Sequence, residues 1–425
     1  MLKYGKKKIL ILFCCIIIIP AGCGRRSNAD TDAESGREGQ SARVTEAAGT
    51  VSEEAGGRGT SGTEDKDVIE ETKAIAELYR DIYEKAVREN KTGSQELVRD
   101  IISRLGENGY AAVDTENQIN MVNPDLVRNF CGKVEEKEEA EATILTVMEK
   151  GDIVRYDLGT AGGTVNVVRM VLNWKNGVPD VTYQNAYPAY SWTYGNDGYL
   201  FFDEYVPPGY DGPPGYTAIR MEPLDPGLRE LNEKYILPPG YDLNNMFTAD
   251  WNEEDYGELN FYDLYERMYQ MKYGRAPFEA AIDSEVYRVP EEIFESVFTA
   301  YFRLDSKVLR QYTDYLDKEN AYRYRTRGQY DFAPTPSVPY PEVTAWEVNT
   351  DGTITLTVNA VWPREHLARA FSHEVVIRLL EDGRFQYVSN HVIPSENNVE
   401  PVWYTDRLSE EQWENYYGER FLPVT

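Results

Sequence analysis

Cysteine and histidine are scarce in this chain, and their scarcity limits how it can be stabilised and what chemistry it can carry. Only 4 of the 425 residues are Cys and only 3 are His. Cys14, Cys15 and Cys23 lie at the N-terminal end, so Cys131 is the single Cys of the body. A disulfide framework within the body is therefore excluded. Because Cys131 follows Phe130 at the end of a predicted helix, we expect it to be buried and unreactive.

Basic residues are also fewer than acidic residues. The chain has 44 Lys and Arg against 72 Asp and Glu, which gives a formal net charge of −28. A protein that binds nucleic acid needs a basic surface for the phosphates, so the composition predicts no nucleic-acid partner. A large net charge of one sign keeps a protein soluble, and we interpret most of the acidic residues as solvated surface.

The common catalytic motifs are missing. The sequence contains no Gly-x-Ser-x-Gly turn and no phosphate-binding glycine loop. His373 and Glu374 begin a zinc-protease-like pattern but lack its second His. Paired carboxylates could hydrolyse glycans, but 72 acidic residues give no basis for choosing a pair. The sequence therefore predicts no catalytic residue, no cofactor and no metal site.

Segment 193–204 comes nearest to a calcium-binding loop. Asp197, Gly198 and Glu204 fit three positions of an EF-hand loop, but Thr193 and Gly195 stand where its first two carboxylates belong. We therefore expect a hairpin turn at residues 196–198.

Long apolar runs are absent except near the N-terminus. Ile9 to Ile19 is an unbroken apolar stretch that follows four Lys residues, and Pro20 ends it. This run is far shorter than the roughly 20 residues of a membrane-spanning helix. A basic start, a short apolar core and small residues at the end are typical of a secretory signal.

The end of this stretch, Ala21-Gly22-Cys23, resembles the lipobox of the bacterial lipoprotein family. Pro20 departs from the pattern, because Leu, Val or Ile usually stands there. The resemblance covers residues 1–23 and implies a signal peptide of residues 1–22, acylation of Cys23, and anchoring to the cell membrane on its extracytoplasmic face. Each buried CH₂ contributes about 0.8 kcal/mol, so two or three acyl chains anchor a protein durably. An ordinary cleaved secretion signal and an uncleaved anchor remain alternatives.

Residues 23–67 are predicted to be a disordered tether. They are rich in Gly, Ser, Thr, Glu and Ala, and Val44 and Val51 are nearly their only large apolar residues. Such a segment cannot bury enough apolar surface to offset the entropy of ordering it. A flexible chain of this length reaches on the order of 35–40 Å.

The body alternates helical and strand-like stretches. Helical spacing of apolar residues from Val68 is followed by a group of four predicted strands, and helical spacing from about Asn260 is followed by another. The first group comprises Ala142–Met148, Ile153–Leu158, Thr164–Trp174 and Val178–Ala186. The second group comprises Val343–Val348, Thr353–Trp362, Ser372–Leu380 and Arg384–Ile393.

We therefore predict an α+β fold of two lobes, residues 68–186 and 259–425. Each lobe has helices followed by an antiparallel four-strand meander, because the connections between the strands are short and marked by turn residues such as Asn176-Gly177. A distant duplication is one explanation, and two unrelated lobes are another. The order of elements also resembles the cone-shaped lobes of the nuclear-transport-factor-2-like type, at the level of fold alone.

Residues 187–258 are rich in Pro, Gly and Tyr and are predicted to be an ordered but irregular connector. Pro-Pro-Gly-Tyr occurs three times, ending at Tyr210, Tyr216 and Tyr241, and Pro-Gly pairs favour turns. Aromatic faces can stack on sugar rings, and Tyr covers partner surfaces well. The candidate ligand-binding residues are Trp192, Tyr194, Tyr199, Tyr205, Tyr210 and Tyr216. The alternative is that these Tyr residues simply pack the connector.

Together these features predict a membrane-anchored extracytoplasmic lipoprotein that acts as a non-enzymatic surface binding module. Its partner would be a glycan, the cell wall or another protein. A hydrolase of glycans or cell wall is the first alternative. A solute-binding lipoprotein of a transporter is the second, although that class favours alternating strands and helices around a parallel sheet.

Overall fold

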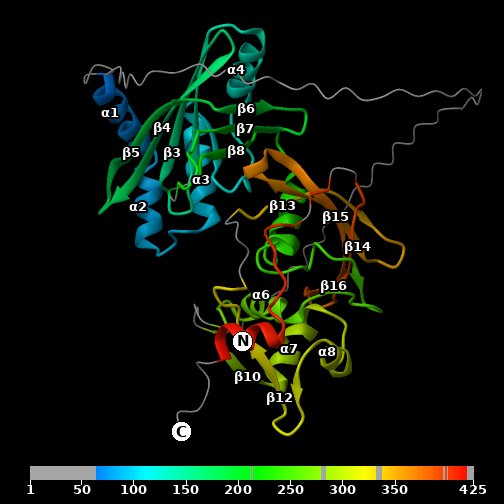
Figure 1. Cartoon of the computed structure of the whole chain (residues 1–425). Coiled ribbons are helices and arrows are strands. Elements are labelled where there is room, and N and C mark those ends of the chain that lie inside the picture. Colours follow the sequence, from blue (N-terminus) through cyan, green and yellow to red (C-terminus); the bar gives the residue numbers. More distant parts are fainter. Residues whose placement is uncertain are drawn as a thin grey trace, which may run out of the picture. The chain divides into compact units, whose positions relative to one another are not determined.

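The computed structural model describes residues 64–210, 212, 214–278, 284–331, 337–395, 398–399 and 401–418 (Figure 1). Cys23 and residues 1–63 lie outside this range, so acylation and the tether stay predictions. Helix α1 (Glu64–Glu77) begins within the last four residues of the predicted tether. Among the described helices, none has the length and apolar character needed to cross a membrane.

The first sheet contains the four strands predicted for residues 142–186. Strands β2 (Ala140–Val147), β3 (Ile153–Ala161), β4 (Thr164–Lys175) and β5 (Val178–Pro188) pair in antiparallel order. The Asn176-Gly177 turn joins the last two, with φ angles of 54° and 76° that suit a tight hairpin. A fifth strand, β1 (Ala111–Asp114), pairs in parallel with β2 and was not predicted.

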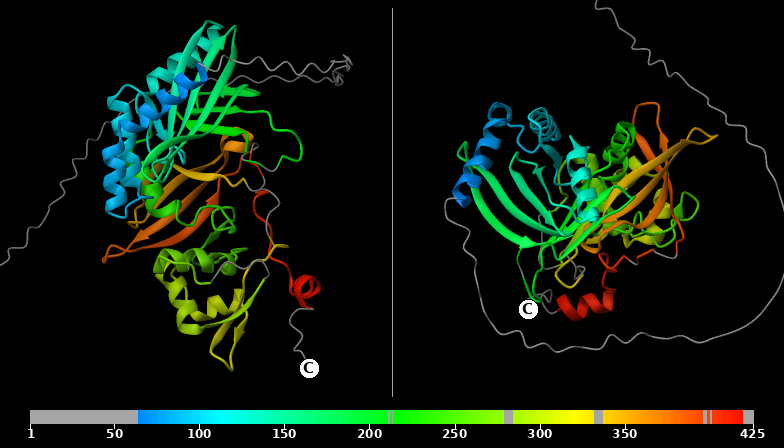
Figure 2. Two further views of the ribbon diagram at one scale, coloured as in Figure 1. Left: turned by 90° about the vertical axis from the view of Figure 1, so that its left-hand side faces the viewer. Right: turned by 90° about the horizontal axis from the view of Figure 1, so that it is seen from above.

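Helices cover both faces of this sheet (Figure 2). Helices α1, α2 (Arg80–Arg88) and α3 (Gln95–Glu107) pack on one face, where Leu145 and Leu172 point. Helix α4 (Pro124–Glu136) packs on the other face, around Phe130 and Ile144. The side chain of Ser94 caps α3 by accepting from the Leu97 backbone N–H at 3.2 Å, as its sequence position predicts.

The segment predicted to be an irregular connector forms regular structure, which corrects that expectation. Strands β6 (Ser191–Tyr194), β7 (Tyr199–Asp203) and β8 (Tyr216–Arg220) make an antiparallel sheet. Strand β7 is apolar on both faces, because Leu200 and Phe202 enter one core and Tyr199 and Phe201 enter another. Helix α5 (Pro226–Leu231) and the π-helix η1 (Asn232–Ile236) follow.

The second large sheet has the strand order β13-β14-β15-β16-β9. Its four main strands are β13 (Tyr340–Val348), β14 (Ile354–Trp362), β15 (Leu367–Leu379) and β16 (Phe385–Val392). The two-residue strand β9 (Trp251–Asn252) comes from the predicted connector and pairs with β16. The 3₁₀ turn η2 (Pro363–Glu365) links β14 to β15.

The remaining elements lie between β9 and β13 in the sequence, except for helix α9, which follows β16. A small antiparallel sheet contains β10 (Val286–Pro290), β12 (Ala321–Arg325) and β11 (Tyr315–Leu316). The helices are α6 (Phe261–Tyr273), α7 (Glu291–Tyr301), α8 (Ser306–Tyr312) and α9 (Glu410–Tyr417). Ser409 and Gln412 form the predicted capping box of α9.

The structure thus confirms a mixed α+β fold with mostly antiparallel sheets. Two matching lobes with one four-strand meander each are too simple a description, because β1 and β9 extend the large sheets and two smaller sheets add further strands. Many of the aromatic side chains belong to the interior. One core cluster buries Tyr235, Tyr241, Tyr256, Tyr265, Tyr322, Tyr324 and Tyr387.

Candidate functional site

Of the six predicted ligand-binding residues, Trp192 and Tyr194 lie on the same face of β6 and are half-buried. The Trp192 ring stacks on Phe202 at 5.7 Å and meets the Phe130 ring edge-on at 5.8 Å. The Tyr194 hydroxyl donates a hydrogen bond of 3.1 Å to Glu222. Both side chains therefore help to close a core, and each leaves only part of its ring exposed.

Tyr199 lies on the opposite face of the same small sheet and is fully buried. Its hydroxyl donates to Oε1 of Glu342 at 2.9 Å and accepts from the Tyr340 hydroxyl at 3.1 Å. The Arg220 guanidinium sits 4.9 Å from the centre of its ring. Burial raises the pKa of Tyr199 well above its ordinary value. Its side chain has no exposed face to offer a ligand in this structure.

The other three residues do not extend that face. Tyr205 and Tyr210 are 59% and 51% exposed, and Tyr216 is half-buried. Tyr190, which the sequence did not single out, is 71% exposed, and its ring centre lies 5.4 Å from that of Tyr205. The six predicted residues therefore do not make one continuous aromatic patch, and Tyr205 instead lies beside the exposed Tyr190.

A large hollow lies on the face of the first sheet that α1 to α3 cover. It has a volume of about 770 Å³, within the range of roughly 300–1,000 Å³ typical of ligand pockets. We call it the cup. Side chains from α1 and from β2 to β5 line it. Its polar or charged lining residues are Glu71, Glu141, Thr143, Arg155, Asp157, Asn166 and Gln184.

Arg155 forms part of the wall of the cup, although only 5% of the residue is exposed. Its Nε donates to Asp157 at 2.9 Å, its Nη1 donates to Thr72 at 3.2 Å, and its Nη2 lies 3.2 Å from a Glu71 carboxylate oxygen. Burial lowers the pKa of Arg155, but the two carboxylates outweigh burial and raise it overall. The guanidinium is thus held rigidly in its charged form.

Gly159 opens the floor of the cup. It lies within β3, where Glu141 and Asn166 are its partners on the two neighbouring strands. A Cβ atom added at Gly159 would meet nothing within 4 Å, and its φ lies outside the left-handed region. Neither backbone conformation nor packing therefore requires glycine here. A glycine inside a strand weakens it and often marks close approach of a ligand or another backbone.

A second pocket, of about 250 Å³, lies between the start of α3 and the loop that follows β1. Asp114, Glu116 and Glu149 bring three carboxyl groups to it. Burial raises the pKa of Asp114, although its oxygens accept two backbone N–H groups at 2.9 and 2.8 Å. The pKa of Glu116 is raised, first by loss of solvent around its carboxyl group and then by the charges of Asp114 and Glu149. The residue as a whole is nevertheless exposed.

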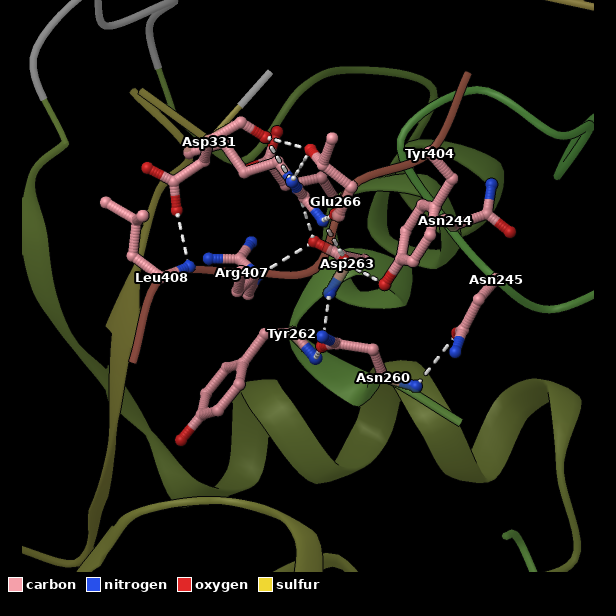
Figure 3. Close-up of polar contacts among 12 residues, drawn as sticks. Asn244, Asn245, Asn260, Tyr262, Asp263, Glu266, Asp331, Tyr404, Arg407 and Leu408 are labelled. Atoms are coloured by element: carbon pink, nitrogen blue, oxygen red, sulfur yellow. Dashed lines mark hydrogen bonds and ion pairs between the residues drawn. The ribbon is translucent and has the colours of Figure 1, made fainter. Parts of the chain in front are cut away.

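A third cluster of charge surrounds Asp263 on α6 (Figure 3). Its side chain is fully buried and accepts two hydrogen bonds of 2.8 Å from Arg327. It also accepts one of 2.7 Å from Arg407 and one of 2.9 Å from the Tyr404 hydroxyl. Because both carboxylate oxygens are fully used, we interpret this cluster as a structural clamp between α6 and the C-terminal segment.

The isolated residues with reactive side chains also have structural surroundings. Cys131 is 1% exposed, and burial raises the pKa of its thiol to about 12. His373 is buried and bonded to Tyr241 and Asn390. Asp197 and Gly198 lie in the β6–β7 turn, as predicted, and the Asp197 carboxylate accepts the Tyr199 backbone N–H. In the part of the chain that the structure describes, no group of three or more His, Cys, Asp or Glu side chains is placed to hold a metal ion.

Sequence reasoning missed the cup, although β3 carries a local signal for it. Arg155, Asp157 and Gly159 alternate with the apolar Tyr156 and Leu158, which is typical of a strand with one polar face. The contribution of α1 to the same hollow has no local signal, because it depends on how the helix packs.

These features define a mixed α+β protein with a ligand-sized polar hollow beside its first sheet. Residues 65–407 match the model of a family described as a family of unknown function (DUF6070). Since the match covers more than half of the chain, the chain belongs to this family. No curated protein and no solved structure matches the chain.

Proposed function

We propose that this protein is a membrane-anchored extracytoplasmic lipoprotein that acts as a non-enzymatic binding module, with the cup as its ligand site. The observation that carries this proposal is the open space above Gly159, since neither packing nor backbone conformation requires glycine there. The resemblance of Ala21-Gly22-Cys23 to a lipobox supports the location.

A glycan is the ligand class that the cup suits best. Carboxylate, amide and hydroxyl groups of Asp157, Asn166 and Thr143 line it, and such groups exchange hydrogen bonds with sugar hydroxyls. The exposed pair Tyr190 and Tyr205 lies just beyond the end of β5, and β5 supplies part of the cup. Aromatic rings there would offer flat apolar faces to a sugar that extends past the cup.

The test is retention of the full chain, in detergent, on panels of immobilised cell-wall and other glycans. Replacing Gly159 by Leu places a bulky apolar side chain at the floor of the cup, and we expect this variant to fold but to lose retention. Gly132→Leu is the matched control, because Gly132 lies in α4 and a Cβ there also meets nothing within 4 Å. Equal retention of both variants would exclude the cup as the binding site.

A hydrolase is the second candidate, and the pocket of Asp114, Glu116 and Glu149 is the observation that favours it. Carboxyl groups with raised pKa values can act as general acids near neutral pH. Here Glu116 would be the acid and Glu149 its partner. Release of reducing sugar that Glu116→Gln abolishes would support this reading. Hydrolysis that survives the substitution would exclude Glu116 as the acid.

A further inference from the structure

The cup carries more negative than positive charge. Glu71, Glu141 and Asp157 supply three carboxylates, against the single guanidinium of Arg155. Arg155 pairs with both Glu71 and Asp157, so its charge is already neutralised by the protein. Glu141 is exposed, and no hydrogen bond or ion pair engages its carboxylate among the described residues. Within the cup, the Glu141 carboxylate therefore has no partner among the described residues, whereas the Arg155 cation is already paired.

The hydrogen-bonding groups of the cup also favour a ligand that donates hydrogen bonds. Thr143 and Arg155 both donate to Oδ1 of Asp157, at 2.7 and 2.9 Å. The described residues place no hydrogen-bond donor on the Oδ2 atom of Asp157. Across the strands, Glu141 and Asn166 flank the space above Gly159. A ligand that combines a positive charge with hydroxyl groups would satisfy both kinds of acceptor.

We propose that the cup prefers oligosaccharides that carry free, protonated amino groups over the same oligosaccharides with acetylated amines. This inference rests on the proposed function, because it names the ligand class of the same site. A protonated amine would pair with Glu141, and neighbouring hydroxyls would bond Asp157 and Asn166. An acidic sugar is disfavoured because the charge of Arg155 is already neutralised by Glu71 and Asp157. A bare metal ion fits poorly, because no described group of acidic side chains is placed to hold one.

The test compares two ligands with the same backbone by calorimetry on the full chain in detergent, at about pH 6, where amines are protonated. One is the tetramer of glucosamine, and the other is the tetramer of N-acetylglucosamine. We expect the glucosamine tetramer to bind about two- to fivefold more tightly, a difference that corresponds to one screened charge pair. Equal binding, or tighter binding of the acetylated tetramer, would overturn the preference.

Substitutions then assign the preference to residues. We expect Glu141→Gln to weaken binding of the glucosamine tetramer much more than binding of the acetylated tetramer, and so to remove most of the preference. Glu135→Gln, on α4 at the opposite face of the sheet, is the control with the same change of charge. Spermidine tests whether charge alone suffices. If it binds as tightly as the glucosamine tetramer and is lost equally in Glu141→Gln, the sugar part of the inference is wrong.

The same variants separate failure of this inference from failure of the proposed function. If Gly159→Leu abolishes binding of a neutral or acetylated glycan and the amines have no effect, the cup is the ligand site and the amine preference is wrong. If Gly159→Leu changes binding of none of the glycans, the cup is not the ligand site, and the proposed amine preference of the cup is wrong as well.

Discussion

The hydroxyl of Tyr199 donates a 2.9 Å hydrogen bond to Oε1 of Glu342, across 143 positions of sequence. Glu342 is 3% exposed and is also 3.1 Å from Arg220 and 3.9 Å from Arg229. Strands β7, β8 and β13 therefore meet at a buried polar junction. A residue predicted to contact a ligand instead holds distant parts of the chain together.

This junction gives the first prediction. Tyr199→Phe removes a hydrogen bond to a buried carboxylate, and such bonds contribute about 1.5–3 kcal/mol. We expect the free energy of unfolding to fall by about 2 kcal/mol in denaturant titrations. Tyr205→Phe is the control, because Tyr205 is 59% exposed and should change stability little. Equal stability of Tyr199→Phe and the parent protein would contradict the role of the junction.

The clamp around Asp263 gives the second prediction. Asp263→Asn leaves Arg327 and Arg407 buried without their shared carboxylate. Breaking a buried ion pair by removing one partner costs about 3–5 kcal/mol, and we expect a loss of that size in thermal or denaturant unfolding. Asp317→Asn, at an exposed position, should have little effect. A loss below about 1 kcal/mol would show that the cluster is not a stabilising clamp.

His373 predicts a dependence of stability on pH. Nδ1 lies 2.7 Å from Oδ1 of Asn390, whose amide nitrogen is already bonded to the Ala249 carbonyl. Nδ1 therefore carries the proton, and Nε2 accepts from the Tyr241 hydroxyl at 2.8 Å. Burial of this neutral ring lowers the pKa of His373 to about 3. Because a pKa of about 6.5 is expected in the unfolded chain, the unfolded state binds more protons between these values.

The contribution of His373 to the free energy of unfolding is therefore greatest above about pH 6.5 and falls as the pH is lowered toward 3. The contribution of His373 should be a loss of about 1.4 kcal/mol for each pH unit, or about 2 kcal/mol from pH 6.5 to pH 5. Denaturant titrations of the parent protein and of His373→Gln across this range measure it. The variant should be less stable at neutral pH but should lose less on acidification. Parallel curves would contradict the prediction.

Cys131 should be chemically silent in the folded protein. Burial, followed by the charge of Glu135, raises the pKa of its thiol to about 12, so almost no thiolate is present near neutral pH. We expect a thiol reagent to modify Cys131 only after denaturation, with Cys131→Ser as the blank. Rapid modification of the native protein would show that this part of the core opens readily.

Cys23 carries the prediction about location. Cys23→Ala should leave unprocessed precursor and abolish labelling with fatty acid, because the acceptor thiol is gone. Fatty-acid labelling that persists in Cys23→Ala would exclude acylation at this residue.

Local sequence signals predicted much of the secondary structure. The N-caps Ser94, Asp305 and Ser409 are of the kind that local sequence reveals, because capping is an interaction between neighbours in sequence. The eight main strands of the two large sheets were found from alternation and turn residues. Strands β1 and β9 were missed because four and two residues are too short to show a pattern.

The sequence did not indicate the cup, and the tyrosines show why contacts between distant residues are hard to predict. A Tyr ring with its hydroxyl suits a surface or a core equally, and partners far away in sequence decide between them. Tyr199 is buried because Tyr340 and Glu342 are present to bond its hydroxyl. Glu71 joins Arg155 across a gap of 84 positions, which no local pattern reveals.

The pairing of β9 with β16 has a consequence for how the chain can be divided. Trp251 and Asn252 cover the outer edge of β16, opposite Asn390 and Ser389. A fragment that began at residue 259 would lack that cover and would present unpaired backbone groups of β16 to solvent. Free sheet edges pair readily with other chains, so such a fragment should self-associate.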